Sequence, residues 1–271
     1  MSQILNTRIG VIGAGTMGQA LIKGLLARQM PRRYLIAADS DSQTRRVVRR
    51  RFTIAVTSEV DHVVATSDVI VLAVKPQQVG DLIDEIAPQI SRRQLVISIA
   101  AGIRLRWLQH RLPGVPVIRV MPNLPATVGS GFAAIAAGRL AMPAHRAITA
   151  SLFGAVGKVV ELPERQFDAI TAISGSGPAY VFFLVHAWTT AARQLGLPAS
   201  VATLAIAQTL EGSVKLLRAA GAPVDALIAQ VASTGGTTEA ALRVLASRRV
   251  AAHVAEAIQA AARRSRGLSW A

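Results

Sequence analysis

The sequence lacks cysteine altogether, so disulfides, thiolate nucleophiles, zinc–thiolate sites and iron–sulfur clusters are excluded. Aromatic residues make up only 4% of the chain, too few to indicate the stacking platforms that bind single-stranded nucleic acids. Long apolar runs are missing as well: Val69–Val74 and Ala179–Val185 are both too short to span a bilayer. Residues Met1 to Thr7 lack the apolar core of a secretory signal. We therefore expect a soluble, cytoplasmic protein with no membrane partner.

Acidic residues are half as numerous as basic ones, 15 against 30, which gives a formal net charge of +15. Such a charge would indicate a nucleic-acid partner if it were clustered on one face. Only four of the basic residues are lysines, however, and the arginines are scattered along the chain. We expect solvated helix faces, no nucleic-acid partner, and a general attraction for anionic cofactors and substrates. A non-catalytic dinucleotide-sensing or polyanion-binding protein is kept as the alternative.

The first half of the chain alternates short apolar runs with amphipathic segments, a pattern typical of βα units that build a parallel sheet. Strands are predicted at Arg8–Ile12, Tyr34–Ala38, Thr53–Val56, Val69–Val74, Leu95–Ile99, Val117–Val120, Gly131–Ala137 and Lys158–Glu161. Helices are predicted at Met17–Arg28, Ser42–Arg50, Val60–Ala65, Val79–Ile86, Leu105–His110 and Ala144–Phe153. The sequence thus predicts an α/β domain over residues 1–165.

The second part of the chain, residues 166–271, is alanine-rich and predicted to be helical, with breaks at Gly196–Pro198, Gly221–Pro223 and Ser233–Gly236. Two of its segments, Tyr180–Ala192 and Val201–Leu210, are apolar nearly all round. A domain of about 100 residues cannot cover such helices by itself. We therefore expect a homo-oligomer whose helical domains pack together.

A glycine-rich segment, Gly13-Ala14-Gly15-Thr16-Met17-Gly18, follows the first predicted strand and opens the first predicted helix. This is the G-x-G-x-x-G fingerprint in the context that it requires. The first glycine permits a tight turn, the second lets the backbone approach the pyrophosphate, and the third allows the helix to pack closely on the strand. We predict that these six residues bind a dinucleotide.

The choice of dinucleotide depends on residues near the end of the second predicted strand. Asp39 lies 21 residues beyond Gly18, where an acid accepts hydrogen bonds from the adenosine ribose. A carboxylate there repels the 2′-phosphate of NADP, whereas Arg45 and Arg46 in the next helix would attract it. Both NADPH and NADH are therefore kept as cofactors, with NADH expected to be at least a competent hydride donor.

Two further segments end predicted strands at the same edge of the sheet. Ala73-Val74-Lys75-Pro76 ends the fourth strand, where proline prevents the strand from continuing. Ala100 and Ala101 end the fifth, and their small side chains would let a nicotinamide ring approach. Ligands of open α/β sheets bind at the carboxyl ends of the strands, so we assign these residues to the cofactor site.

A turn between two helical patterns, Ser233-Thr234-Gly235-Gly236-Thr237-Thr238, is the candidate substrate site. Free backbone N–H groups at the start of the second helix would point into the break and bind a carboxylate. A purely structural turn, capped by Ser233 or Thr237, explains the same pattern.

The chain resembles the pyrroline-5-carboxylate reductase family over nearly its whole length. The matching segments occur in the family's order: Gly13–Gly18, Ala73–Pro76, Ser98–Gly102, Arg119–Asn123, Ser174–Tyr180 and Gly235–Thr238. The resemblance implies a Rossmann-like N-terminal domain, a C-terminal all-helical dimerisation domain, and a dimer or a decamer of dimers. It implies reduction of 1-pyrroline-5-carboxylate to L-proline with NADPH or NADH.

The same resemblance assigns roles at the substrate end. It puts the catalytic Thr238 hydroxyl at the ring nitrogen, and Gly235, Gly236, Thr237 and Thr238 with Ser233 around the carboxylate. Glu164 and Gln230 are implied to line the substrate site. One departure is Thr234, which stands where the family usually has proline, so the turn's rigidity is in question rather than its chemistry.

Other catalytic arrangements are not found in the sequence. The β-hydroxyacid dehydrogenases share this architecture but use a lysine that would fall at Val181 in the register of Gly175 and Gly177, and valine cannot act as an acid or base. The five histidines show no metal-ligand spacing, so no metal site is expected. A reductase of a related cyclic imine is the alternative within the same chemistry.

Overall fold

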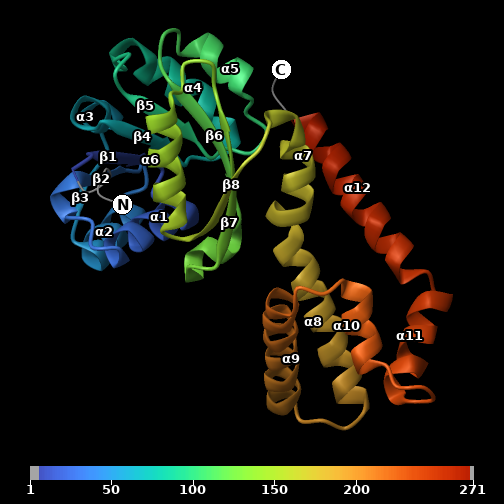
Figure 1. Cartoon of the computed structure of the whole chain (residues 1–271). Coiled ribbons are helices and arrows are strands. Elements are labelled where there is room, and N and C mark those ends of the chain that lie inside the picture. Colours follow the sequence, from blue (N-terminus) through green and yellow to red (C-terminus); the bar gives the residue numbers. More distant parts are fainter. Residues whose placement is uncertain (1–5, 269–271) are drawn as a thin grey trace. The chain divides into compact units, whose positions relative to one another are not determined.

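The computed structural model describes residues 6–268, which divide into two compact units (Figure 1). The first unit runs to Ser176 and includes the chain again from Ala261 onward, and the second is Gly177–Ala260. This boundary lies later than residue 165, where the sequence analysis put it. The reason is that Phe167 is buried in the core of the first unit, and Ser265 donates a hydrogen bond to Asp168 Oδ1 at 2.7 Å.

The first unit is built on an eight-stranded sheet with the order β3-β2-β1-β4-β5-β6-β7-β8. The strands are β1 (Ile9–Ile12), β2 (Leu35–Ala38), β3 (Ala55–Thr57), β4 (Val69–Leu72), β5 (Leu95–Ser98), β6 (Val117–Pro122), β7 (Gly131–Ala137) and β8 (Gly157–Glu161). All neighbours pair in parallel except β6 and β7, which are antiparallel. Each of the eight predicted strands is present, with bounds that differ by at most two residues.

Helices cover both faces of the sheet (Figure 1). One face packs against α1 (Thr16–Ala27), α2 (Ser42–Phe52) and α6 (Pro143–Gly154). The other packs against α3 (Val60–Thr66), α4 (Val79–Ile86), α5 (Leu105–Arg111) and α7 (Phe167–Ile170). Short 3₁₀ helices lie in the connections: η1 (Arg32–Tyr34), η2 (Pro76–Gln78), η3 (Ala87–Gln89), η4 (Leu124–Val128) and η5 (Glu164–Gln166).

The alternation of side chains in β4 illustrates why the strands read as continuous apolar runs. Val69 and Val71 pack into one core, whereas Ile70 and Leu72 pack into the other. Side chains of a strand alternate between the two faces of its sheet, so a strand covered on both faces is apolar at every position.

The antiparallel pair β6 and β7 follows from a short connection. Parallel neighbours need a crossover of a dozen or more residues, but only residues 123–130 separate these strands, and they hold the single 3₁₀ helix η4. The chain therefore returns alongside β6, and α6 then carries it to β8, which is parallel to β7.

The second unit is entirely helical. It contains α8 (Gly177–Gln194), α9 (Ala199–Ala220), α10 (Val224–Val231), α11 (Thr237–Ser247) and the first part of α12 (Val250–Leu268). Among residues 177–260, all of which are described, only Ala202 and Ile206 are buried. Large apolar side chains are exposed instead, with Phe182 62%, Phe183 71% and Leu204 71% accessible. A single copy of this unit thus leaves most of its apolar surface in water, which fits the expectation of an oligomer.

One helical stretch, Glu164–Gln194, reaches the length and hydropathy of a membrane span, with 6% of its most apolar window buried. It is interrupted within the first unit by a π-helix, η6 (Thr171–Gly175), and it carries Pro178. Apart from Ile173 in η6, its large exposed apolar side chains lie on α8, in a unit whose other helices also expose such side chains. Surfaces of this kind mark sites of interaction with another protein or with a membrane.

The packing of α1 against the loop before β8 provides a test of the first unit. A methyl group added at Gly24 would lie 2.3 Å from Val156 Cγ1 and 2.9 Å from the Ala155 carbonyl oxygen. We expect Gly24→Ala to lower the free energy of unfolding by about 1–3 kcal/mol, the usual cost of overpacking. Gly154→Ala at the end of α6 is the matched control, because nothing lies within 4 Å of the new methyl group there. Equal urea denaturation midpoints for the two variants would contradict the packing described here.

Candidate active site

Two of the three glycines in the loop after β1 have a steric reason within the protein, and the third faces open space. Gly13 has a φ of +97°, and a Cβ there would come within 2.7 Å of the backbone of Ala73 and Val74. At Gly18 a Cβ would lie 2.2 Å from the Gly13 carbonyl oxygen. Around Gly15, in contrast, there is open space. The loop is therefore compressed on its protein side and open where a pyrophosphate would approach.

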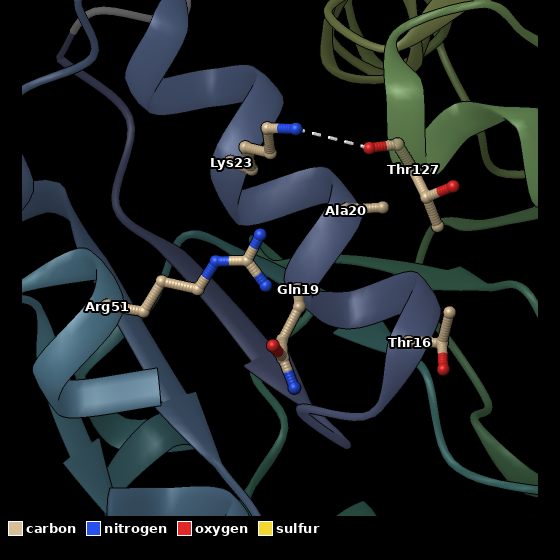
Figure 2. A pocket seen from close by; sticks show the side chains of 6 residues that line it. All are labelled: Thr16, Gln19, Ala20, Lys23, Arg51 and Thr127. Carbon is tan, nitrogen blue, oxygen red and sulfur yellow. Dashed lines mark hydrogen bonds between the residues drawn. The ribbon is translucent and has the colours of Figure 1, made fainter. Parts of the chain in front are cut away.

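The start of α1 is suited to an anion. Gly15 is its N-cap residue, no described side chain caps it, and its first turn holds no acidic residue. The free N–H groups and the helix dipole are thus left to a ligand. A second pocket, of about 210 Å³, lies along α1 and is lined by Thr16 and Lys23 among others. There Lys23 donates a hydrogen bond to the Thr127 carbonyl (Figure 2).

A larger cavity of about 630 Å³ lies at the carboxyl edge of the sheet. Six of the predicted cofactor residues line it: Gly13, Gly15, Asp39, Ala73, Val74 and Lys75. Ala14, Gly18 and Ala100 are buried, Met17 and Pro76 are half-buried, and Ala101 is exposed. The structure therefore brings the ends of β1, β2 and β4 together around one cavity of the size that a dinucleotide half needs.

Several lining residues were not singled out from the sequence: Ser40, Asp41, Thr44, Ser58, Gln78, Asp81, Leu82 and Glu85. Most of them directly follow a strand or begin the helix after it. The rule that ligands bind at the carboxyl ends of parallel strands would have found them, had it been applied to β2 and β3 as it was to β4. Four carboxylates, those of Asp39, Asp41, Asp81 and Glu85, and one lysine line the cavity, which makes it acidic.

Asp39 holds the glycine loop in addition to facing the cavity. Its Oδ2 accepts from the Ala14 N–H at 2.8 Å, and its Oδ1 accepts from the Asp41 N–H at 2.9 Å. A carboxylate has about four acceptor sites, so two are left for ribose hydroxyls. The Ala14 N–H is thereby taken and is not available to a phosphate.

The start of α2 bears on the 2′-phosphate question. Asp41 caps the helix, and hydrogen bonds from Thr44 and Gln43 hold the pKa of its carboxyl below the ordinary value, so it stays charged. Arg45 donates to the carbonyl oxygens of Asp39 and Ser40 at 2.8 and 2.7 Å, whereas Arg46 is exposed. The local charge is set by two carboxylates, and Arg45 is already engaged by the backbone.

Glu164, predicted to line the substrate site, is bound inside the first unit. Its Oε1 accepts from Arg119 Nη1 at 2.9 Å and from the Leu105 N–H, the first of α5, at 2.7 Å. Arg119 is only 4% exposed, and its guanidinium carbon lies 4.8 Å from the centre of the Phe167 ring. Glu164 therefore neutralises a buried arginine and caps α5, a role that the sequence analysis did not include.

The predicted carboxylate-binding turn lies in the second unit. Gly235 has a φ of +70°, and Gly236 is the N-cap residue of α11 without any side-chain cap. Two of the N–H groups are already bonded: Gly236 donates to the Ser233 carbonyl at 3.0 Å, and Gly235 donates to Glu239 Oε2 at 2.5 Å. Among the described residues, the N–H groups of Thr237 and Thr238 have no acceptor, as expected in a first helical turn. The turn thus holds one carboxylate of its own and has donors left for another.

The remaining predicted residues are also found in the second unit. Thr238 is half-buried in the first turn of α11, and Gln230 is exposed near the end of α10. Val181, the position of the lysine in hydroxyacid dehydrogenases, is an exposed residue of α8. Among the described residues there is no cluster of three potential metal ligands.

Two family models match the chain. One, described as NADP oxidoreductase coenzyme F420-dependent, covers residues 8–102. The other, described as pyrroline-5-carboxylate reductase dimerisation, covers residues 164–268. The first match contains the glycine loop and the second contains the turn before α11.

Curated relatives and solved structures agree with these matches. A pyrroline-5-carboxylate reductase of Arabidopsis thaliana is 38% identical over 263 residues, covering 97% of this chain and 95% of the relative. The structure of the Coxiella burnetii enzyme has a TM-score of 0.91 at 30% identity, covering 98% of this chain and 99% of that one. A Plasmodium falciparum pyrroline carboxylate reductase with NADP bound has a TM-score of 0.90 at 28% identity, with the same coverage. The full-length similarity, the open glycine loop and the turn of α11 together show that this chain belongs to the pyrroline-5-carboxylate reductase family.

Proposed function

We propose that the protein reduces 1-pyrroline-5-carboxylate to L-proline, the last step of proline biosynthesis, with NADPH or NADH as the hydride donor. The proposal depends above all on the similarity to pyrroline-5-carboxylate reductases over 97% of the chain. It is supported by a glycine loop in which Gly15, unlike Gly13 and Gly18, has open space around it, where a dinucleotide would approach. The assay is oxidation of NADH and of NADPH, followed separately with pyrroline-5-carboxylate, and no turnover with either would refute the proposal.

The cofactor end of the reaction is held by the first unit. The N-terminus of α1 would hold the pyrophosphate, Asp39 would accept hydrogen bonds from the adenosine ribose, and Ala73–Pro76 with Ala100 and Ala101 would border the nicotinamide. The reduced nicotinamide, when bound, supplies a hydride to the imine carbon. The residues of the chain contribute alignment and exclusion of water, and no general base among them is required if the iminium form binds.

The substrate end is assigned to the second unit. The N–H groups of Thr237 and Thr238 hold the substrate carboxylate at the positive end of α11. The Thr238 hydroxyl makes a hydrogen bond at the ring nitrogen, where it can donate or accept. As the new C–H bond forms, the electron pair of the C=N bond moves to nitrogen, which keeps its proton and becomes the secondary amine. Gln230 and Glu164 stay assigned to the substrate site as part of this proposal.

NADH is favoured over NADPH by the charges near the adenosine site. Asp39 and Asp41 both line the cavity, and Arg45 is occupied by backbone carbonyls. Two carboxylates repel a 2′-phosphate placed beside them unless an arginine forms an ion pair with that phosphate. Of Arg45 and Arg46, the exposed Arg46 is the one that could pair with a 2′-phosphate.

Assembly follows from the exposed apolar helices of the second unit. We propose a homo-oligomer, either a homodimer formed through this unit or a decamer built of such dimers, in a soluble cytoplasmic enzyme without nucleic-acid or membrane partners. The match of residues 164–268 to a dimerisation model supports the dimer.

Thr238→Ala tests the assigned catalytic residue. Loss of one hydrogen bond to a charged group is worth about 1.5–3 kcal/mol, so kcat/KM for pyrroline-5-carboxylate is expected to fall by about tenfold to a hundredfold. Thr203→Ala is the matched control, because its hydroxyl bonds only to the Ala199 carbonyl within α9. Unchanged kcat/KM in Thr238→Ala would remove this residue from the mechanism.

Asp39→Asn tests the discrimination between dinucleotides. Asparagine keeps an acceptor for the Ala14 N–H but removes the charge, so the ratio of kcat/KM for NADPH to that for NADH is expected to rise by about tenfold, or about 1.4 kcal/mol. Asp39→Ser is expected to shift it in the same direction with a further loss of overall affinity. A ratio that stays constant would show that Asp39 does not discriminate.

Glu164→Gln separates the two roles of this residue. The variant leaves the buried Arg119 without its counter-charge, so the free energy of unfolding is expected to drop by about 2–3 kcal/mol. In contrast, Glu211→Gln in the exposed pair with Lys215 on α9 should cost about 0.5 kcal/mol or less. A raised KM for pyrroline-5-carboxylate would support the substrate role, whereas an unchanged KM would restrict Glu164 to pairing with Arg119.

A further inference from the structure

The π-helix η6 (Thr171–Gly175) lies in the first unit, three residues before Pro178. Its widened turn is closed by the Ser176 N–H, which donates to the Thr171 carbonyl at 2.8 Å. In an α-helix, the Ser174 carbonyl would accept from the residue four positions later, but that residue is Pro178. Proline has no N–H, and its ring clashes with this same carbonyl. The Ser174 carbonyl therefore needs a donor from elsewhere.

Asn123 supplies that donor. Its Nδ2 lies 3.2 Å from the Ser174 carbonyl oxygen and 3.0 Å from the Ser174 hydroxyl. Its Oδ1 accepts from the Phe132 N–H in β7 at 2.8 Å. One half-buried amide thus ties the widened turn to the end of β6 and to β7. The turn also touches β6 itself, because a Cβ at Gly175 would lie 2.7 Å from Met121 Cε.

The position of Asn123 in the sheet connects this amide to the cofactor. Asp39 follows β2, the glycine loop follows β1, Ala73 follows β4, Ala100 lies just beyond β5, and Asn123 follows β6. These five strands are parallel neighbours in that order, so all five positions lie at one edge. A dinucleotide that extends from Asp39 across the glycine loop toward Ala100 has its nicotinamide at the Asn123 end.

We propose that Asn123 is a positioning residue for hydride transfer. It holds the widened Thr171–Ser176 turn in place beside the position where the nicotinamide would bind. The proposal rests on the reductase activity proposed above. A turn that can relax lets the reacting atoms drift from their contact distance, and a misplacement of about 1 Å can cost about a hundredfold in rate. Pro178 leaves the Ser174 carbonyl of this turn without a helical donor, so the position of that carbonyl depends on the Asn123 amide.

The test is a kinetic comparison of Asn123→Ala and Asn123→Asp with the full-length enzyme. Aspartate still accepts from the Phe132 N–H but cannot donate to Ser174, so both variants should lose kcat by about tenfold or more. The KM for NADH should stay within about threefold, because Asn123 does not touch the adenosine or pyrophosphate sites. With deuterium at the transferred position of the reduced nicotinamide, the isotope effect on kcat should exceed that of the wild type, since hydride transfer becomes slower relative to product release.

The control variant is Gln94→Ala. Gln94 is also a half-buried amide with three hydrogen bonds to the backbone: it donates to the Val64 and Ser67 carbonyls and accepts from the Ser91 N–H. It precedes β5, at the opposite edge of the sheet. Its loss should lower the thermal midpoint as much as Asn123→Ala does, yet leave kcat and the isotope effect unchanged.

Four outcomes overturn the proposal. Asn123→Asp with wild-type kcat would show that the donor to Ser174 is dispensable. Equal losses of kcat in Gln94→Ala and Asn123→Ala would reduce the role of Asn123 to stability. A wild type without turnover would overturn the reductase assignment and this proposal together, whereas an active wild type with an equally active Asn123→Ala would overturn only the latter.

Discussion

The cavity at the carboxyl edge of the sheet, where we place the cofactor, depends on the close approach of two backbone segments. Gly13 turns with a positive φ directly over the backbone of Ala73 and Val74, and no side chain fits between them. The Ala73 N–H donates to the Ile12 carbonyl at 2.7 Å, and the Gly13 N–H donates to the Ala38 carbonyl at 2.8 Å. Because of these contacts, the ends of β1, β2 and β4 lie side by side and together line the cavity. Asp39 then fastens the loop from the side through the Ala14 N–H.

The two units bury their apolar side chains to different extents. The first buries two cores, one on each face of its sheet, in a single chain. The second has no core of comparable size, and its aromatic residues Phe182 and Phe183 face solvent. In the homodimer proposed above, association would supply the free energy that stabilises this unit, and its stability would then depend on protein concentration.

The sequence was sufficient for those features that local rules determine. All eight strands, the helices between them and the tight packing at Gly13 and Gly18 follow from side-chain alternation and from the turn that the fingerprint requires. The antiparallel direction of β7 was missed, although the length of the connection at residues 123–130 carries that information. The pairing of Arg119 with Glu164 was also missed, because the two residues are 45 positions apart and no local pattern links them.

At the substrate turn, the sequence predicted free N–H groups but not the side chain that competes for them. Glu239 occupies the Gly235 N–H, an i to i+4 contact that is compatible with the spacing but not dictated by it. The relation between Asn123 and Pro178 is of the same kind. A proline in a helical pattern predicts that the carbonyl four residues before it lacks its usual N–H donor. Only the fold shows which side chain donates to that carbonyl instead.

The return of the chain to the first unit has a consequence for its biosynthesis. Residues 261–268 belong to that unit, yet the ribosome makes them after the whole helical unit at 177–260. The hydrogen bond from Ser265 to Asp168 can therefore close only after those 84 intervening residues have emerged. During translation, at about 5–20 residues per second, the nascent sheet waits several seconds for its last segment. In that interval the surface of the first unit that this segment later covers stays exposed, together with the apolar side chains of the helical unit.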